Sequence, residues 1–214
     1  MFKTIRNAFK VKELREKILY TLMMLVVIRF GSQLPIPGIE TSFFANWFAK
    51  QTTDVFGFFN AMTGGSFSSM SIFALSITPY ITSSIIIQLL TIAIPKLEEL
   101  QKDGEDGRKK IQEYTRYTTV GLALIESSAM AIGFGRQGLL IDYNAWNIII
   151  AIVTMTTGSA LLMWIGEQIT EKGVGNGISI VLLFNILSSV PNDVRSLYYR
   201  FIFGQTVLKA AIAI

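Results

Sequence analysis

Long apolar runs recur along this chain, and their lengths suit helices that cross a membrane. A spanning helix needs about 20 mainly apolar residues. The runs that approach this length are residues 18–34, 71–94, 118–134 and 146–165. Residues 177–190 form a shorter run, whose length fits either a spanning helix or a buried, half-crossing one. The pattern predicts an all-α, multi-pass membrane helix bundle.

The second long run is preceded by a short apolar helix and a break. Residues 55–62 are apolar but too short to cross a bilayer, and the small residues 63–66 interrupt them. The run that follows carries side chains that lipid does not accommodate well, namely Ser76, Thr78, Pro79, Tyr80, Thr82, Ser83, Ser84 and Gln88. Polar groups inside a bilayer need partners, and broken helices with polar faces line aqueous paths or binding cavities. The broken helix with its polar side chains therefore indicates a protein that moves a substrate across the membrane.

Composition supports a membrane protein and excludes several kinds of chemistry. Hydrophobic residues make up 51% of the 214 residues and charged residues 16%, which is too apolar for a soluble domain of this size. The chain has no cysteine and no histidine, which excludes disulfides, thiolate metal sites and the commonest general base. The sequence also lacks a nucleophile–base pair, a metal-ligand set and a nucleotide-binding loop. We therefore expect no enzymatic activity, no metal and no cofactor.

Basic residues are distributed unevenly between the two sides of the predicted bundle. Residues 1–17 form a basic, amphipathic segment before the first span. With this segment in the cytoplasm, the inside segments carry 13 Lys and Arg and the outside segments carry four. Because an excess of Lys and Arg marks the cytoplasmic side, we expect a cytoplasmic N-terminus. A sixth apolar run begins near residue 201 and reaches residue 214, so we also expect the chain to be a fragment.

Residues 95–116 form a long, highly charged connection on the inner side. Acidic residues precede a glycine-containing turn at residues 104–107, and the basic triplet Arg108, Lys109 and Lys110 follows it. A solvated connector explains these charges. A docking surface for a cytosolic partner that presents phosphate or acidic side chains explains them equally well. The residues leave both interpretations open.

Residues 166–176 form the second inner connection. Its glycine-rich run at residues 173–177 is no phosphate-binding loop, because no strand precedes it and no Lys–Ser/Thr pair closes it. A tight turn between two helices, with positive φ at several glycines, fits better. We expect Asn176 to cap the following helix and the glycines to let two helices approach closely.

Six motifs, in this order along the chain, resemble those of the SecY family, whose members form the pore of the bacterial protein-conducting channel. They are GSQLPIPG (31–38), SIFALSITPYI (71–81), IIIQLL (85–90), GRKK (107–110), YTRY (114–117) and GEQITEKGVGNGIS (166–179). Members of this family have ten spans in two halves related by an inverted pseudo-repeat. The resemblance implies that residues 18–190 form the five-span N-terminal half, and that residues 191–214 form an external loop and the start of a sixth span.

The resemblance also implies a pore ring and a plug. The ring would include the branched aliphatic residues Ile77, Ile81 and Leu182, of which the first two lie four apart on one helix face. A narrow aliphatic collar excludes water and ions yet flexes around a passing peptide. The plug would be residues 55–67, with Val55, Phe56, Phe58, Phe59, Met62, Gly64 and Gly65 as its apolar and hinge residues. Without the resemblance, an interfacial helix lying on the membrane fits the same residues equally well.

Gln88, Glu126 and Arg29 are polar or charged side chains within predicted spans. The resemblance places Gln88 and Glu126 beside the lateral gate, the seam through which hydrophobic segments reach lipid. The residues alone fit either an ion or proton relay or a hydrogen bond that latches two helices. Arg29, near the outer end of the first span, fits a snorkelling or interhelical contact better than a transport role.

A channel subunit that passes unfolded preproteins across the cell membrane, and releases membrane spans laterally into lipid, is the function that the resemblance implies. The implied partners are the small subunits SecE and SecG, the SecA motor, the ribosome with its rRNA, preprotein signal sequences and membrane lipid. The alternative is a secondary transporter of a small solute with Glu126 as the coupling carboxylate. A transporter needs convergent polar ligands near the midplane, whereas a channel needs the dry collar.

Overall fold

The fold is known from a computed structural model that describes residues 11–42, 46–47 and 54–198. Side chains at residues 54–56, 192–193 and 196–197 are not part of this description, and neither are the first ten residues of the basic segment or the sixth apolar run. The elements are α2 (Lys12–Gly31), α4 (Asp54–Met62), α5 (Thr78–Ala93), α6 (Pro95–Lys102), α7 (Glu105–Phe134), the π-helix η1 (Gly135–Leu139), α8 (Ala145–Lys172) and α9 (Gly177–Tyr198). Among the described residues, extended pairing is limited to two isolated bridges, Pro35–Ser71 and Ile39–Leu140. The all-α prediction is confirmed.

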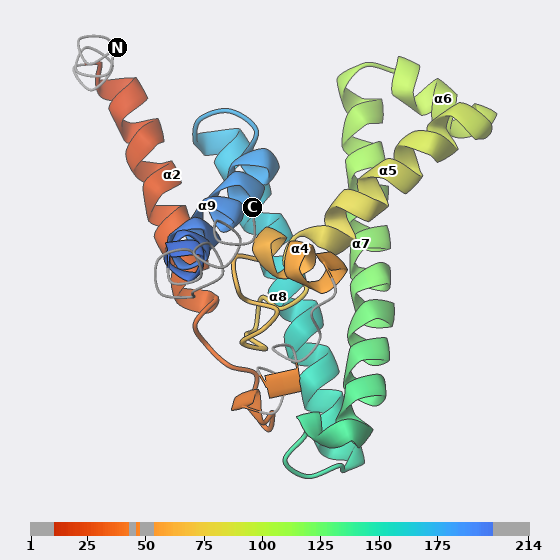
Figure 1. Ribbon diagram of the computed structural model, residues 1–214. Coiled ribbons are helices and arrows are strands. Elements are labelled where there is room, and N and C mark those ends of the chain that lie inside the picture. The colour runs from red at the N-terminus through yellow and green to blue at the C-terminus, as the bar shows by residue number, and fades with distance from the viewer. Residues whose placement is uncertain (1–10, 43–45, 48–53, 199–214) are drawn as a thin grey trace, which may run out of the picture.

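The long helices α7 and α8 run side by side and form the spine of the molecule (Figure 1). The chain turns between them at η1, where Gly138 has a φ of 104°. The helix α5 packs against α7, whereas α2 and α9 pack against α8. In the described part of the chain, residues 105–139 and α8 are long and apolar enough to cross a membrane, and the bent pair α5–α6 would make a third span. The five-span arrangement therefore stays a prediction, since α2 carries charges and the apolar part of α9 ends at Pro191.

The predicted span at residues 71–94 is wrong as a single helix. The helix α5 begins only at Thr78, because Met70 and Ser76 have φ values of 44° and 53°, which an α-helix cannot contain. The preceding segment instead bonds to the chain after α2, through Ile36 N to Met70 O (3.1 Å). At its other end α5 stops before Pro95, and α6 continues at an angle of 102°.

Both predicted inner connections are much shorter than expected. Helices α6 and α7 fill almost all of residues 95–116 and leave a turn at residues 103–104, where Gly104 has a φ of 77°. Likewise α8 continues through Lys172, so the second connection consists of residues 173–176. Residues 105–116 are helical although they are highly charged, because pairs of charged side chains on the surface of a helix can stabilise it in water.

The glycine-rich turn between α8 and α9 agrees with the prediction in most respects. Asn176 Oδ1 accepts a hydrogen bond from Ser179 N (3.2 Å), which confirms the predicted cap. A Cβ at Gly177 would overlap the carbonyl oxygen of Gly166, so the two helices do approach closely here. Positive φ is confined to one glycine of this turn, Gly175 at 69°, rather than several. The turn rests on α2, because Val174 N donates to Thr21 Oγ1 (3.2 Å).

Two buried clusters hold the helices together. The first gathers residues from the segments flanking α4 and from the lower halves of α7 and α8; its members include Ile36, Phe67, Met70, Leu75, Leu139 and Met155. The second joins α2, α8 and α9 around the start of α5, and consists of Leu25, Ile28, Phe73, Ile77, Leu162, Ile165, Ile169 and Val181. Buried hydroxyls add hydrogen bonds between helices, such as Ser127 Oγ with Thr156 Oγ1 at 3.0 Å. Such bonds suit a bundle whose helices meet in lipid, where the hydrophobic effect does not drive helices together and packing and hydrogen bonds must do so.

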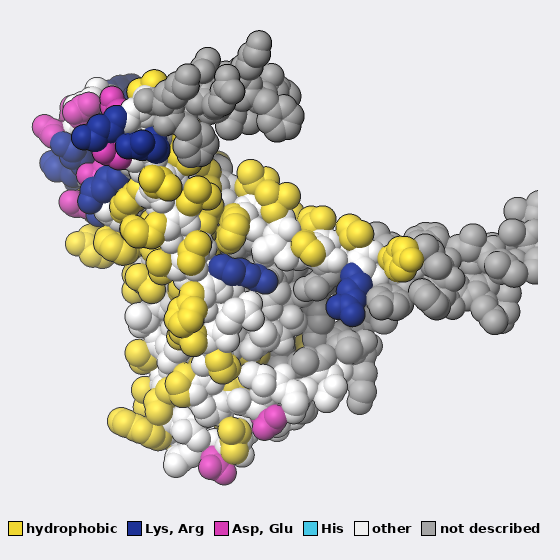
Figure 2. All heavy atoms as spheres, turned by 90° about the vertical axis from the view of Figure 1, so that its left-hand side faces the viewer, with side chains coloured by type: hydrophobic (Ala, Val, Ile, Leu, Met, Phe, Trp, Pro, Cys, Tyr) yellow, Lys and Arg dark blue, Asp and Glu magenta, His cyan; other side chains and the backbone are white. Residues whose placement is uncertain are grey.

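Charge is concentrated at one end of the molecule. Figure 2 shows Lys, Arg, Asp and Glu side chains gathered at its upper end, with mainly hydrophobic and uncharged surface below. Figure 1 places the start of α2, all of α6, the start of α7 and the α8–α9 turn at this end. Exposed apolar side chains cover much of the rest, including Val26, Phe30, Ile92, Ile125 and Trp146. A charged end above an apolar belt is the surface expected of a membrane protein.

Candidate functional site

The break after α4 is an ordered turn with its own hydrogen bonds. At nine residues, α4 is about 13 Å long, which is less than half of a bilayer core. Asn60 stabilises the turn, because its Oδ1 accepts from Ser68 N (3.0 Å). Gly64 and Gly65 have φ values of 65° and 84°, which allow the chain to reverse. The short helix that was expected from the sequence is therefore confirmed, and it is attached through a glycine turn.

Arg29 of α2 reaches this turn. Its Nη1 donates to the carbonyl oxygen of Gly64 (3.1 Å) and to Ser188 Oγ of α9 (3.2 Å). The guanidinium therefore joins α2, the turn after α4, and α9. This confirms that Arg29 makes an interhelical contact.

A second polar junction surrounds the strained residue before α5. Ser76, whose φ is positive, accepts a hydrogen bond at Oγ from Asn185 Nδ2 (3.2 Å), and its carbonyl oxygen accepts from Ser159 Oγ (3.2 Å). Ser76, Ser159 and Asn185 are all buried. The sequence analysis did not single out Asn185. Its amide stands alone in the apolar run LLFNIL, and a lone polar group in such a run needs a hydrogen-bonding partner, so this is the signal that could have identified it.

The structure brings two of the three predicted ring residues together. Ile77, directly before α5, is only 1% exposed, and Ile81, one turn later, packs against the same buried cluster. Val181 of α9 belongs to that cluster, whereas its neighbour Leu182 is half-buried and lies outside it. The junction of α5, α8 and α9 is thus lined by tightly packed aliphatic groups. The ring itself stays a prediction.

The two polar residues assigned to the gate, Gln88 and Glu126, lie in different surroundings. Glu126 of α7 is half-buried and lines an apolar pocket of about 380 Å³, together with Phe59 of α4 and Phe67. These two rings meet edge to face, with centroids 5.1 Å apart. Gln88 is exposed on α5 and donates to Ser84 Oγ (3.3 Å). The described contacts of Gln88 are therefore local, while Glu126 faces the short helix.

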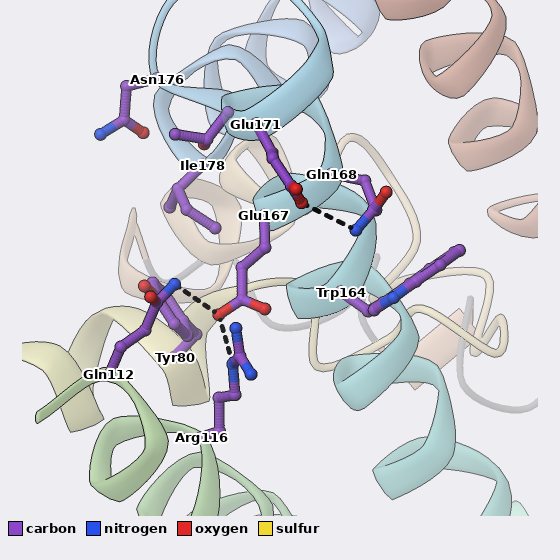
Figure 3. A pocket seen from close by; sticks show the side chains of 10 residues that line it. Tyr80, Gln112, Arg116, Trp164, Glu167, Gln168, Glu171, Asn176 and Ile178 are labelled. Carbon is purple, nitrogen blue, oxygen red and sulfur yellow. Dashed lines mark hydrogen bonds and ion pairs between the residues drawn. The ribbon is translucent and has the colours of Figure 1, made fainter. Parts of the chain in front are cut away.

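A polar pocket of about 470 Å³ lies at the charged end, between α5, α7, α8 and the start of α9. Glu167 of α8 is its centre: Oε1 accepts from Arg116 Nε (2.8 Å) and from Gln112 Nε2 (3.1 Å), as Figure 3 shows. The side chain of Glu167 is 12% exposed, whereas that of Arg116 is 45% exposed. The pair fixes the upper ends of α7 and α8 to each other. Sequence reasoning did not identify it, because the two residues are 51 positions apart.

The predicted docking triplet lies in the first turns of α7, at the same charged end. Arg108, Lys109 and Lys110 are all exposed, and Lys109 has a distant ion pair with Asp106 (3.9 Å). The triplet is therefore presented on a helix rather than on a loop. Its accessibility suits docking, but its function stays a prediction.

Comparison with known proteins assigns the family. The family model described as SecY matches residues 71–214. Protein translocase subunit SecY of Escherichia coli K12 is 46% identical over 183 residues, which are 84% of this chain and 41% of that protein. The subunits of the same name from Bacillus subtilis 168 and Corynebacterium glutamicum are 45% and 44% identical; they match 92% and 88% of this chain, and in each case 46% of the relative. The chain belongs to the SecY family. It spans about half the length of the curated relatives that it matches.

Solved structures show the same fold. Sec61 in the canine ribosome-channel complex from the endoplasmic reticulum matches with a TM-score of 0.58 and 18% identity, over 82% of this chain and 37% of that one. A structure described as that of a protein conducting channel matches to the same extent. The predicted resemblance to SecY is thus confirmed, and the secondary-transporter alternative finds no support.

Proposed function

We propose that this chain is the N-terminal half of a protein-conducting channel subunit, which passes unfolded preproteins across the membrane and releases membrane spans laterally into lipid. The observation that carries this proposal is the identity of 43–46% to SecY subunits over most of the chain. The geometry is consistent with it, because a partly unwound span begins at an aliphatic junction and a short helix packs on α9 beside it. Broken spans of this kind are used where a membrane protein must provide a path for a solute or a chain.

The roles of individual residues follow from the same proposal. Ile77, Ile81 and Leu182 supply half of an aliphatic ring, and the other half of the channel supplies the rest. The short helix α4 and its turn, residues 55–67, form the stopper. Gln88 and Glu126 belong to the lateral gate, where Glu126, which lines the pocket beside Phe59, serves as a latch rather than in proton transport.

The partners and location are part of the proposal. The protein resides in the cell membrane with its N-terminus in the cytoplasm, so that the charged end in Figure 2 faces the cytosol. The SecE and SecG subunits complete the channel, and signal sequences enter lipid at its seam. Energy for translocation comes from the SecA motor or a translating ribosome, including its rRNA, docked on that end. The subunit itself is a conduit and not an enzyme.

The aliphatic ring is tested by ion leak through the full-length channel, reconstituted with its small subunits in a planar bilayer. Replacing Ile81 by Ala, or Ile77 and Ile81 together, shortens the groups that exclude water, so the resting ion current should rise. Deleting residues 55–67 should raise it further, and preprotein passage should persist. Ile92→Ala is the matched control, because Ile92 is 80% exposed on the same helix.

Ile77 is deeply buried, so its truncation also lowers stability, by about 2–5 kcal/mol. The half-buried Ile81 is therefore the decisive position. A well-folded channel that carries Ile81→Ala and the deletion, and still shows no resting current, would contradict the ring and the stopper together.

A further inference from the structure

We propose that Arg29 is the positioning residue of the short helix α4: its guanidinium holds the turn after α4 against α9, and the helix moves away only when these hydrogen bonds break. The inference rests on the proposed function in taking α4 as the stopper. The contacts that carry it are independent of that role. They are the two hydrogen bonds from Arg29 Nη1, to Gly64 O (3.1 Å) and to Ser188 Oγ (3.2 Å).

The position of Arg29 along α2 makes these contacts necessary. Arg29 lies twelve positions after Lys17, or about 18 Å further along the helix, which in the proposed topology is within a bilayer core of about 30 Å. Its neighbours Val26, Val27 and Phe30 are exposed apolar residues. An arginine at such a depth needs partners. Among the described residues, none of the ion pairs includes Arg29, so its charge is met by the neutral oxygens of Gly64 and Ser188.

The turn that Arg29 holds fits closely against α9. Gly64 is buried, and a Cβ at this position would lie 2.7 Å from Ser188 Oγ and 3.0 Å from the carbonyl oxygen of Asn185. Ser188 Oγ donates its proton to that same carbonyl oxygen (2.8 Å), which leaves its lone pairs to accept from Arg29. The guanidinium therefore bonds both to the turn and to the surface on which the turn rests.

The same turn of α9 also holds the strained residue before α5. Asn185 Nδ2 donates to Ser76 Oγ (3.2 Å), so one segment of α9 contacts both the attachment of α4 and the start of the partly unwound span. A shift of α9 relative to both α2 and the segment before α5 would disturb both contacts at once. This geometry couples the release of the short helix to the movement of α9.

A polar cavity makes the release of Arg29 reversible. About 280 Å³ in volume, it is lined by Arg29 itself, by α4 and its turn through Asn60 and Ser68, and by Gln33 of the segment after α2. When the turn leaves, Asn60 and Ser68 leave with it, but the amide of Gln33 stays and can hydrogen bond to the guanidinium, which is therefore not left facing lipid. The contact can consequently open and close without exposing a bare charge to the bilayer.

Site-directed labelling of α4 tests the inference in the full-length channel, reconstituted in lipid vesicles with its small subunits. The chain contains no cysteine, so Phe58→Cys, at a position that is 67% exposed on α4, provides a single site for a spin label in this half. Arg29→Gln should raise the mobile fraction of the label about tenfold, because a hydrogen bond from a charged donor contributes on that scale. Ser188→Ala, which removes one acceptor, should raise it by a smaller factor, and Arg29→Lys should lie between wild type and Arg29→Gln.

Ser189→Ala is the matched control, because Ser189 is adjacent and its hydroxyl bonds to Ile186 O (2.9 Å) within its own helix. It should leave the label as in wild type. Unchanged label mobility in assembled Arg29→Gln channels would overturn the inference; if that variant does not assemble, unchanged mobility in Ser188→Ala does the same.

Resting ion current is measured in parallel. A mobile label without ion leak supports the positioning role of Arg29 and contradicts the stopper role of α4, whereas ion leak with an immobile label overturns the positioning role alone.

Discussion

Small residues determine how closely α8 packs against the segments around it. A Cβ at Gly158 would overlap the carbonyl oxygen of Ile72, in the non-helical segment before α5. A Cβ at Gly166 would lie 2.5 Å from Ile178 Cδ1 at the start of α9. Glycines at these positions let backbones meet at distances that larger residues exclude. Glycines at positions 158 and 166 therefore determine how closely the segments of the aliphatic junction approach α8.

Gly158→Ala should lower the free energy of unfolding by about 1–3 kcal/mol, because the added methyl group meets a backbone atom that cannot move aside cheaply. Denaturant titration of the full-length protein in detergent micelles measures this. Gly121→Ala on α7 is the control, because nothing lies within 4 Å of its added Cβ, and helix propensity should make it neutral or stabilising by up to about 1 kcal/mol. Equal destabilisation by both changes would show that the close contact at Gly158 is unimportant.

At the scale of helices, α7 and α8 are joined by different contacts at different heights. In the middle, Ser127 and Thr156 share a buried hydrogen bond. At the charged end, Arg116 and Gln112 of α7 both bond to Glu167 of α8 (Figure 3). The ion pair is partly exposed, so solvent screening reduces its contribution. It nevertheless fixes the rotation of two long helices relative to each other, and it forms one wall of the pocket at the charged end.

A double-mutant cycle on Arg116→Met and Glu167→Gln should give a coupling free energy of about 1 kcal/mol, measured by the same unfolding titration. The coupling should decrease as salt is added, because the Arg116 side chain is 45% exposed. The pair Lys109 and Asp106 is the control, since its 3.9 Å separation and high exposure predict no measurable coupling. Coupling at Arg116–Glu167 that is no larger than this control would mean that the pair does not hold α7 to α8.

For the whole molecule, the segregation of charge is the dominant feature. The upper end in Figure 2 carries charges of both signs, and the basic triplet at the start of α7 contributes three exposed cations to it. Its place on a rigid helix, rather than on a long loop, gives these cations a fixed spacing. A fixed cationic surface suits recognition of phosphates or acidic side chains on a large partner.

Reversing the charge of Arg108, Lys109 and Lys110 to Glu should weaken binding of ribosomes or of the SecA motor to channel-containing vesicles, and the loss should be greatest at low salt. Membrane assembly should persist, because Lys and Arg remain in the other inside segments. Cosedimentation at several salt concentrations measures the binding. Lys96→Glu with Lys102→Glu, on the neighbouring helix α6, should have a smaller effect. Unchanged binding of the triplet variant would return this region to the role of a connector.

Much of the architecture could be predicted from the sequence, because local patterns determine it. The apolar run at residues 146–165 predicts most of α8, and residues 55–62 predict α4. The cap at Asn176 involves only residues 176–179, which are consecutive, and is visible in the sequence for that reason. The need of Arg29 for an interhelical partner also follows from its place in an apolar run. Family membership rests on motifs that can be read along the chain without knowledge of their contacts.

What the sequence could not decide is which distant groups meet. Unwinding before α5 depends on Ser76, whose strained φ is held by Asn185 and Ser159, and both partners lie more than 80 residues away. Contacts between residues far apart in the sequence also bury Ile77, provide the partners of Arg29 and form the Arg116–Glu167 pair. Hydropathy and helix propensity are properties of neighbouring residues, so the order of residues along the chain was enough to predict α4, most of α8 and the polar break after α4. Pairing of buried polar groups is a property of the packed chain, because each such group takes whatever partner the fold brings within hydrogen-bonding distance.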